Sequence, residues 1–180
     1  MTRRIFVDTE WSAPPWSPEC ELMWVGLADE QGNAWCGVLE GADLDGFRGE
    51  LMRSIAPLVK EERVFSRSGL ADAIRGFCGD VDEFWAWLPP LDRFAEYFEL
   101  GDEAEELFAR HWDVDLAMLR RVVIPWPEGW PEHLCNLGVA AEGFEVPPRS
   151  PDHMHPRVHA LWNREMFLRL PDDRREGCHQ

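Results

Sequence analysis

The chain has 180 residues, 45% of them apolar, which is enough for one domain with a substantial core but short for two. Its net charge of −16, from 34 acidic and 18 basic residues, argues against binding nucleic acid through a broad basic face. The charge does not exclude a metal-dependent nuclease, because bound cations reverse the sign of a carboxylate-lined pocket.

The first predicted element is the strand RIFVDTE, which ends on two carboxylates. Successive side chains of a strand alternate between faces, so Asp8 and Glu10 should point to the same side, ~7 Å apart along the chain. Ile5 and Val7 should face one layer of the core and Phe6 the other. Paired carboxylates suit Mg²⁺ or Mn²⁺. A solvated strand end is the alternative, and for two residues taken alone it is the more common case.

A proline-rich loop, WSAPPWSPE, follows the strand. Two apolar runs around the turn DEQGN then predict a hairpin formed by Glu21 to Ala28 and Ala34 to Leu39. Apolar residues at helical spacing predict a helix over Leu44 to Lys60. A short helix that ends at Phe77 should be capped by Ser68.

An aromatic strand is predicted over Glu83 to Trp87, where two prolines end it. Asp92 follows and opens the helix DRFAEYFEL. The carboxyl ends of strands are where open sheets usually carry their sites, so Asp92 is a third candidate metal ligand. An ordinary helix N-cap is the alternative for this residue, and the two roles are compatible.

The C-terminal half begins with an acidic stretch, Gly101 to Asp115, whose weak apolar stripe favours a solvated helix over disorder. Pro131 should lie in the first turn of a helix that runs towards Ala141. The last helix is expected over about Pro156 to Leu170. The tail, residues 171–180, should be frayed.

These elements and their motifs resemble the DEDDh 3′–5′ exonucleases of the ribonuclease H-like fold, and most closely the small bacterial RNase T-like 3′–5′ exoribonucleases. The motifs are Asp8-Thr9-Glu10, Trp85-Ala86-Trp87 with Asp92, Pro127-Glu128-Gly129-Trp130-Pro131, and a helix that contains His159-Ala160-Leu161. The resemblance implies a single α/β domain over residues 1–170 with a mixed β-sheet flanked by α-helices. Residues 101–124 then form an acidic insertion and residues 171–180 a flexible tail.

The resemblance also implies a reaction, the hydrolysis of phosphodiester bonds at the 3′ end of single-stranded RNA or another nucleic acid. Two Mg²⁺ or Mn²⁺ ions would serve it, held by Asp8, Glu10 and Asp92. His159 would deprotonate the attacking water, and a fourth carboxylate on the last helix would complete the site. The oligomeric state is left open, with a homodimer as one option.

The fourth carboxylate is missing from this sequence. The family pattern has Asp five residues after His, and an alignment on Ala-Leu puts Asn163 at the Asp position and Val158 at the His position. Alternatively, a deletion of one turn leaves His159 as the family His. An Asn carbonyl can ligate but carries no charge, so metal affinity should fall. The segment PEGWP is also followed by Asn136-Leu137 where the family has Asp-Leu.

The histidines have other interpretations. His153 and His155, in HMHP, could form a weak transition-metal site, although surface histidines without a role are commoner. His159 could simply be part of the packed core. Three functions stay open: a metal-dependent exoribonuclease, a degenerate homologue that binds a nucleotide or an RNA end without cutting it, and an acidic interaction protein. The first is favoured because the three carboxylates and His159 fall at the ends of predicted elements.

Composition also predicts the compartment. No apolar run approaches the ~18 residues of a membrane span, and the N-terminus lacks the long apolar segment of a signal peptide. The five cysteines are odd in number and show no CxxC spacing, which favours reduced thiols over a zinc site or a disulfide framework. We therefore expect a cytoplasmic protein with no membrane contact.

Overall fold

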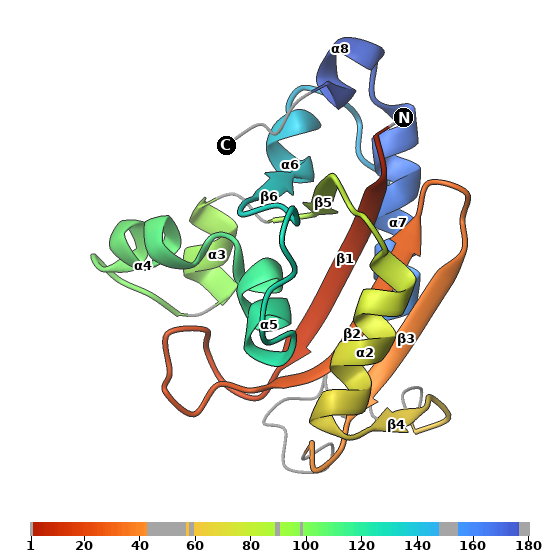
Figure 1. Ribbon diagram of the computed structural model, residues 1–180. Helices are drawn as coiled ribbons and strands as arrows, with labels where there is room; N and C mark the ends of the chain where they lie inside the picture. The colour runs from red at the N-terminus through yellow and green to blue at the C-terminus, as the bar shows by residue number, and fades with distance from the viewer. Residues whose placement is uncertain are drawn as a thin grey trace.

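A six-stranded mixed sheet runs through the computed structural model, which describes residues 2–42, 57, 60–88, 91–97, 99–147 and 155–176 (Figure 1). The strands are β1 (Arg4–Trp11), β2 (Leu22–Asp29), β3 (Ala34–Leu39), β4 (Val64–Phe65), β5 (Glu83–Ala86) and β6 (Leu134–Asn136). Their order across the sheet is β4-β3-β2-β1-β5-β6. β2 is antiparallel to β1 and to β3, and the other neighbours are parallel. The chain is thus a single α/β domain, as expected.

Helices cover both faces of this sheet. They are α2 (Arg67–Cys78), α3 (Leu91–Tyr97), α4 (Ala104–His111), α5 (Val114–Val122), α6 (Leu137–Ala140), α7 (Pro156–Arg169) and α8 (Asp172–Arg175). α7 packs on one face against β1 and β2, while α2 and α5 lie on the opposite face, in front of the sheet in Figure 1. The helix predicted over Leu44 to Lys60 falls almost entirely outside the described residues.

The alternation predicted for the first strand is confirmed. Ile5 and Val7 are buried in the cluster that lies under α2 and α5. Phe6 is buried in the second cluster, beneath α7, where its ring lies 5.3 Å from that of Phe167. Because side chains of a strand alternate, Asp8 and Glu10 continue the Phe6 face and therefore lie on the α7 side of the sheet.

The hairpin is also confirmed, since β2 and β3 pair antiparallel with Gly26 opposite Cys36. β1 pairs with β2 so that Asp8 stands opposite Gly26. The aromatic strand forms as β5, parallel to β1, and ends at Ala86, one residue before the predicted end. β1 is consequently an inner strand, as expected for the strand that carries the candidate ligands.

Two expectations about helix starts are wrong. Residues after Pro131 do not form a helix running to Ala141; Leu134–Asn136 instead form β6, and α6 follows it with Asn136 as N-cap. The strand is short, and its residues are buried beside β5, so pairing with a distant strand overrides the local helix signal. At α2 the cap is Ser66, not Ser68, because Ser66 has an extended backbone and its Oγ accepts the N–H of Gly69 at 3.2 Å.

The acidic stretch holds α4 and the first turn of α5 rather than one solvated helix. Most of α4 is exposed or half-buried, as predicted. Asp115 is the exception, because it is only 7% exposed and lies against β1. The prediction of a solvent-facing carboxylate is therefore wrong for that residue.

The last helix forms as α7 over Pro156–Arg169, as predicted. The tail is less frayed than expected up to Arg175, because α8 adds one turn. Cys20, Cys36 and Cys78 are free thiols, whereas Cys135 is disulfide-bonded, so the expectation of reduced cysteines is wrong for Cys135. Among the helices in the described ranges, none has both the length and the apolar character needed to span a membrane.

Candidate functional site

The carboxylates at the end of β1 meet a histidine that comes from the far end of the chain. Asp8 and Glu10 share one face of β1, and α7 brings His159 over them, 151 positions after Asp8. Ligand atoms of the three residues all lie within 4.8 Å of one another. His159 Nδ1 is 3.2 Å from Asp8 Oδ2, which is a hydrogen-bonding distance. The three side chains therefore form one compact group.

Gly26 explains how α7 comes so close to the sheet. A Cβ atom at this position would lie 2.1 Å from the carbonyl carbon of Pro156 and 2.4 Å from the backbone nitrogen of Arg157. Only a residue without a side chain leaves room for the first turn of α7 to lie directly on β2. Since Gly26 stands opposite Asp8, the same approach brings His159, one turn further along α7, to the Asp8 carboxylate.

The site is largely buried and contains polar atoms that lack partners. The side chain of His159 is 5% exposed and that of Asp8 is 15% exposed. One turn beyond His159, Asn163 is fully buried and donates from Nδ2 to the carbonyl of Val7 at 3.0 Å. His159 Nε2 and Asn163 Oδ1 are both buried without a hydrogen-bond partner among the described residues. Such orphaned atoms are costly, and an ion or a water molecule would satisfy them.

Asn163 lies where the alignment on Ala-Leu requires the family Asp. Residues i and i+4 share one face of a helix, so Asn163 and His159 both point towards β1. His159 and Asn163 are four positions apart, whereas the resemblance implies a spacing of five, so this geometry leaves both alignments open. What the structure shows next to His159 is a buried amide in place of a carboxylate.

Asp92 does not join this group. It is exposed in the first turn of α3, inside the helix that begins at Leu91. Among the described residues, the clusters whose ligand atoms lie within 4.8 Å of one another do not include it. Its part in metal binding stays a prediction, and the third member of the compact group is His159.

A buried carboxylate that sequence reasoning misplaced supports β1 from the opposite face. Asp115 of α5 accepts hydrogen bonds from the N–H of Thr9 at 2.8 Å and from its hydroxyl at 2.6 Å. Pairing of β1 with β5 ends at Phe6 and Trp85, so on this side of β1 none of the described strands pairs with Thr9. Asp115 supplies the missing acceptor and holds the end of β1, on which Asp8 and Glu10 lie. The sequence feature that could have indicated this burial is the position of Asp115 directly before the apolar run LAML.

The donor set of the Asp8 group fits a divalent ion. Two carboxylates and one imidazole offer oxygen and nitrogen ligands, a set that Mn²⁺, Fe²⁺ or Zn²⁺ binds more readily than Mg²⁺. The buried, unpartnered oxygen of Asn163 agrees with a further neutral ligand nearby. Asp8, Glu10 and His159 could thus hold one ion at the end of β1.

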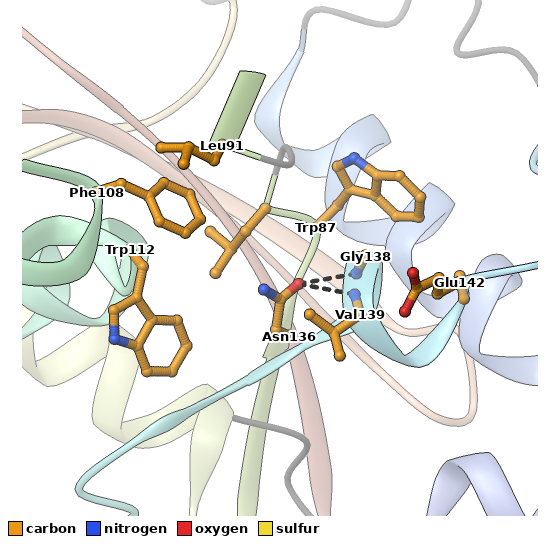
Figure 2. Close-up of a pocket in the computed structure, with 10 residues that line it drawn as sticks. Trp87, Leu91, Phe108, Trp112, Asn136, Gly138, Val139 and Glu142 are labelled. Atoms are coloured by element: carbon orange, nitrogen blue, oxygen red, sulfur yellow. Dashed lines mark hydrogen bonds between the residues drawn. The ribbon is translucent and has the colours of Figure 1, made fainter. Parts of the chain in front are cut away.

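An aromatic cavity of about 680 Å³ lies at the carboxyl ends of β5 and β6 (Figure 2). Its lining is mostly apolar and consists of Trp87, Leu88, Leu91, Phe108, Trp112, Asn136, Gly138, Val139, Ala141 and Glu142. Asn136 Oδ1 accepts the N–H groups of Gly138 and Val139, and its Nδ2 points towards the side formed by Phe108 and Trp112. A cavity of this size and lining suits a planar, largely apolar ligand group.

Trp87 joins this cavity to α7. Its ring packs edge-on against Trp162 with the centroids 5.2 Å apart, and Trp162 lies between His159 and Asn163 on the helix. The contact between Trp87 and Trp162 therefore places the cavity next to the part of α7 that carries His159 and Asn163.

No protein-family model matches this chain, and no curated protein gives a significant match to it.

Proposed function

We propose that this protein is a metal-dependent 3′–5′ exoribonuclease of low activity, which acts on single-stranded RNA ends in the cytoplasm. The observation that carries the proposal is the convergence of Asp8, Glu10 and His159 within 4.8 Å at the end of an inner strand. The proposal includes a ribonuclease H-like fold. It is supported by a sheet in which only β2 is antiparallel to its neighbours and by helices on both faces of that sheet.

Asp8, Glu10 and His159 would hold a divalent ion, which would supply positive charge beside the phosphodiester and lower the pKa of a bound water molecule. The Asp8 carboxylate orients the imidazole through His159 Nδ1. This contact makes His159 a ligand or a positioning residue rather than the free base that the resemblance implies, because Nδ1 faces Asp8 and Nε2 is buried.

The aromatic cavity provides a place for the base of the terminal nucleotide. Bases stack on aromatic side chains with little dependence on sequence, and Trp87, Phe108 and Trp112 offer such surfaces. Asn136 Nδ2 could donate to a base acceptor. Binding through rings and one amide agrees with the net charge of −16, which argues against binding nucleic acid through a broad basic face.

Low activity follows from the ligands that are absent from the group. Asn163 brings no charge, and Asp92 lies outside the cluster. One well-held ion rather than two leaves the charge on the leaving oxygen less well stabilised, and removing one such interaction typically costs ~3 kcal/mol in the transition state. We therefore propose slow release of nucleotides, faster with Mn²⁺ than with Mg²⁺ because the group includes an imidazole.

The test uses single-stranded RNA labelled at its 5′ end and the full-length chain with Mn²⁺ or Mg²⁺. We expect shortening from the 3′ end that Asp8→Ala abolishes. Glu40→Gln, at an exposed position just after β3, is the control for loss of one acidic residue and should retain the wild-type rate. Failure to release nucleotides from any 3′ end with either ion, in protein that still binds RNA, would refute the enzymatic function.

A second candidate is a degenerate homologue that binds a nucleotide or an RNA end without cutting it. The buried amide of Asn163 at the expected carboxylate position favours it, because such a site binds metal weakly. This function predicts RNA binding that survives Asp8→Ala and chelation of metal but is lost when Trp112→Ala opens the cavity. Fluorescence anisotropy with labelled RNA distinguishes the two candidates.

A further inference from the structure

A second group of metal-ligating side chains lies across Gly26 from Asp8, and the proposed function does not use it. Cys36 of β3, Glu62 before β4 and His155 at the start of α7 have ligand atoms within 4.8 Å of one another. Cys36 is 4% exposed and His155 6% exposed. We propose that this group is a binding site for a borderline transition-metal ion of the Zn²⁺ class.

The chemistry of the three donors selects the ion. A thiolate, an imidazole and a carboxylate together suit Zn²⁺ or Co²⁺, whereas Mg²⁺ and Ca²⁺ require oxygen ligands. The three ligands come from three separate segments and converge at the edge of the buried region, with the Glu62 side chain 15% exposed. Three protein ligands leave one tetrahedral position for water or another small ligand.

Arg157 provides the outer contacts that such a site needs. Its guanidinium lies 3.0 Å from Glu62 Oε1, so it orients the carboxylate and balances its charge. Burial raises the pKa of the Cys36 thiol to about 12, while the side-chain charge and the backbone N–H of Arg157 act to lower it. The thiol is therefore protonated before an ion binds, and binding releases that proton while the N–H remains to stabilise the thiolate.

His155 can change its hydrogen bonds to become a ligand. Its Nδ1 accepts the N–H of Arg157 at 3.2 Å and caps α7, and its Nε2 lies 3.2 Å from Glu62 Oε1. In the neutral ring Nε2 thus carries the proton and donates a hydrogen bond to Glu62. If Nε2 bound the ion, the ring proton would move to Nδ1, which could then no longer accept the Arg157 N–H; metal binding would break this cap of α7 and leave the N–H to the thiolate of Cys36. One proton is released in total, from the thiol.

The two groups are separate sites. Asp8, Gly26 and Cys36 stand opposite one another on three neighbouring strands. Because adjacent strands lie ~4.8 Å apart, the Cα atoms of Asp8 and Cys36 are ~10 Å apart, well beyond the ~4 Å between ions that share a reaction. α7 supplies one imidazole to each group, His155 to Cys36 and His159 to Asp8, from successive turns.

The test is a titration of the metal-free, full-length protein with Co²⁺, followed by absorbance. We expect one equivalent of tetrahedral Co²⁺ with a thiolate-to-cobalt charge-transfer band. Cys36→Ser should abolish this band. Cys78→Ser is the matched control, since Cys78 is a buried free thiol whose pKa is also raised by burial to about 12, and it should leave the band unchanged.

His155→Asn provides a second, independent variant. Asn is a good N-cap, so α7 keeps its start while the imidazole is lost, and Co²⁺ affinity should fall on the order of 100-fold or more. Asp8→Ala should leave the band intact, which separates this site from the proposed exoribonuclease site. A missing band in the wild-type protein, or a band that survives both Cys36→Ser and His155→Asn, would overturn the proposal and leave His155, Glu62 and Arg157 as a structural ion-pair network.

Discussion

Replacing Gly26 by Ala tests the contact on which both groups of ligands depend. The new Cβ would lie 2.1 Å from the carbonyl carbon of Pro156, whereas ordinary contacts begin near 3.4 Å. The first turn of α7 would therefore have to withdraw by about 1 Å, and it would carry His155 and His159 with it. Overpacking of this kind typically costs ~1–3 kcal/mol of stability.

The assay is chemical denaturation combined with metal binding and nuclease activity. We expect Gly26→Ala to lower the free energy of unfolding by ~1–3 kcal/mol, to weaken the Co²⁺ band, and to reduce Mn²⁺-dependent activity by up to about 100-fold, as a 1 Å misplacement can do. Gly76→Ala is the control, for which the change in stability should have the opposite sign. Gly76 lies inside α2 with open space around it, so the substitution should stabilise by ~0.5–1 kcal/mol. Wild-type stability and metal binding in Gly26→Ala would refute the close packing of α7 on β2.

Three further changes test individual contacts. Asp115→Ala should lower the free energy of unfolding by ~1–3 kcal/mol, because the N–H and the hydroxyl of Thr9 lose their acceptor; a denaturation curve equal to that of the wild type would contradict the burial of Asp115 against β1. Asn163→Asp should be less stable without metal, because the buried side chain loses its donor to the Val7 carbonyl and gains a charge, and Mn²⁺ should stabilise it more than the wild type. Equal thermal shifts with Mn²⁺ would place Asn163 outside the metal site. Burial holds the pKa of His111 below its ordinary value, so as the pH falls through about 6.5 the unfolded chain takes up a proton that the folded chain does not. Stability should therefore be fully present above that pH and decline below it, and an identical pH profile in His111→Gln would exclude His111 as the cause.

The first strand, the hairpin and α7 could be predicted because their signals are local. Alternating apolar residues in RIFVDTE determine which side chains share a face, whatever the rest of the chain does. That periodicity alone put Asp8 and Glu10 on one side of β1. Pro156 at the first position of α7 and the apolar residues after it marked the last helix in the same way. Two of the three residues of the compact group, Asp8 and Glu10, could thus be predicted from positions close together in the sequence.

Other features depend on partners far away in the sequence, and no local pattern predicts them. β6 exists because Leu134–Asn136 pair with β5, and a three-residue strand has too little periodicity to be recognised. Asp115 lies in an acidic stretch that is typical of a protein surface. It is nevertheless buried, because it accepts the N–H of Thr9 beyond the point where pairing with β5 ends. Asp92 was an equally good candidate ligand in the sequence, and only the path of α3 leaves it exposed and outside the cluster.

The sequence by itself therefore determined the first strand, the hairpin and α7, and the faces on which the side chains of the first strand lie, since those follow from backbone geometry repeated over a few residues. Only the tertiary structure decided which faces meet. The absence of a side chain at Gly26 lets α7 lie on β2, and that single contact brings His159 to Asp8 and His155 to Cys36. Close packing between segments more than 100 positions apart depends on the shapes of both partners at once, and for that reason it is not encoded in either segment alone.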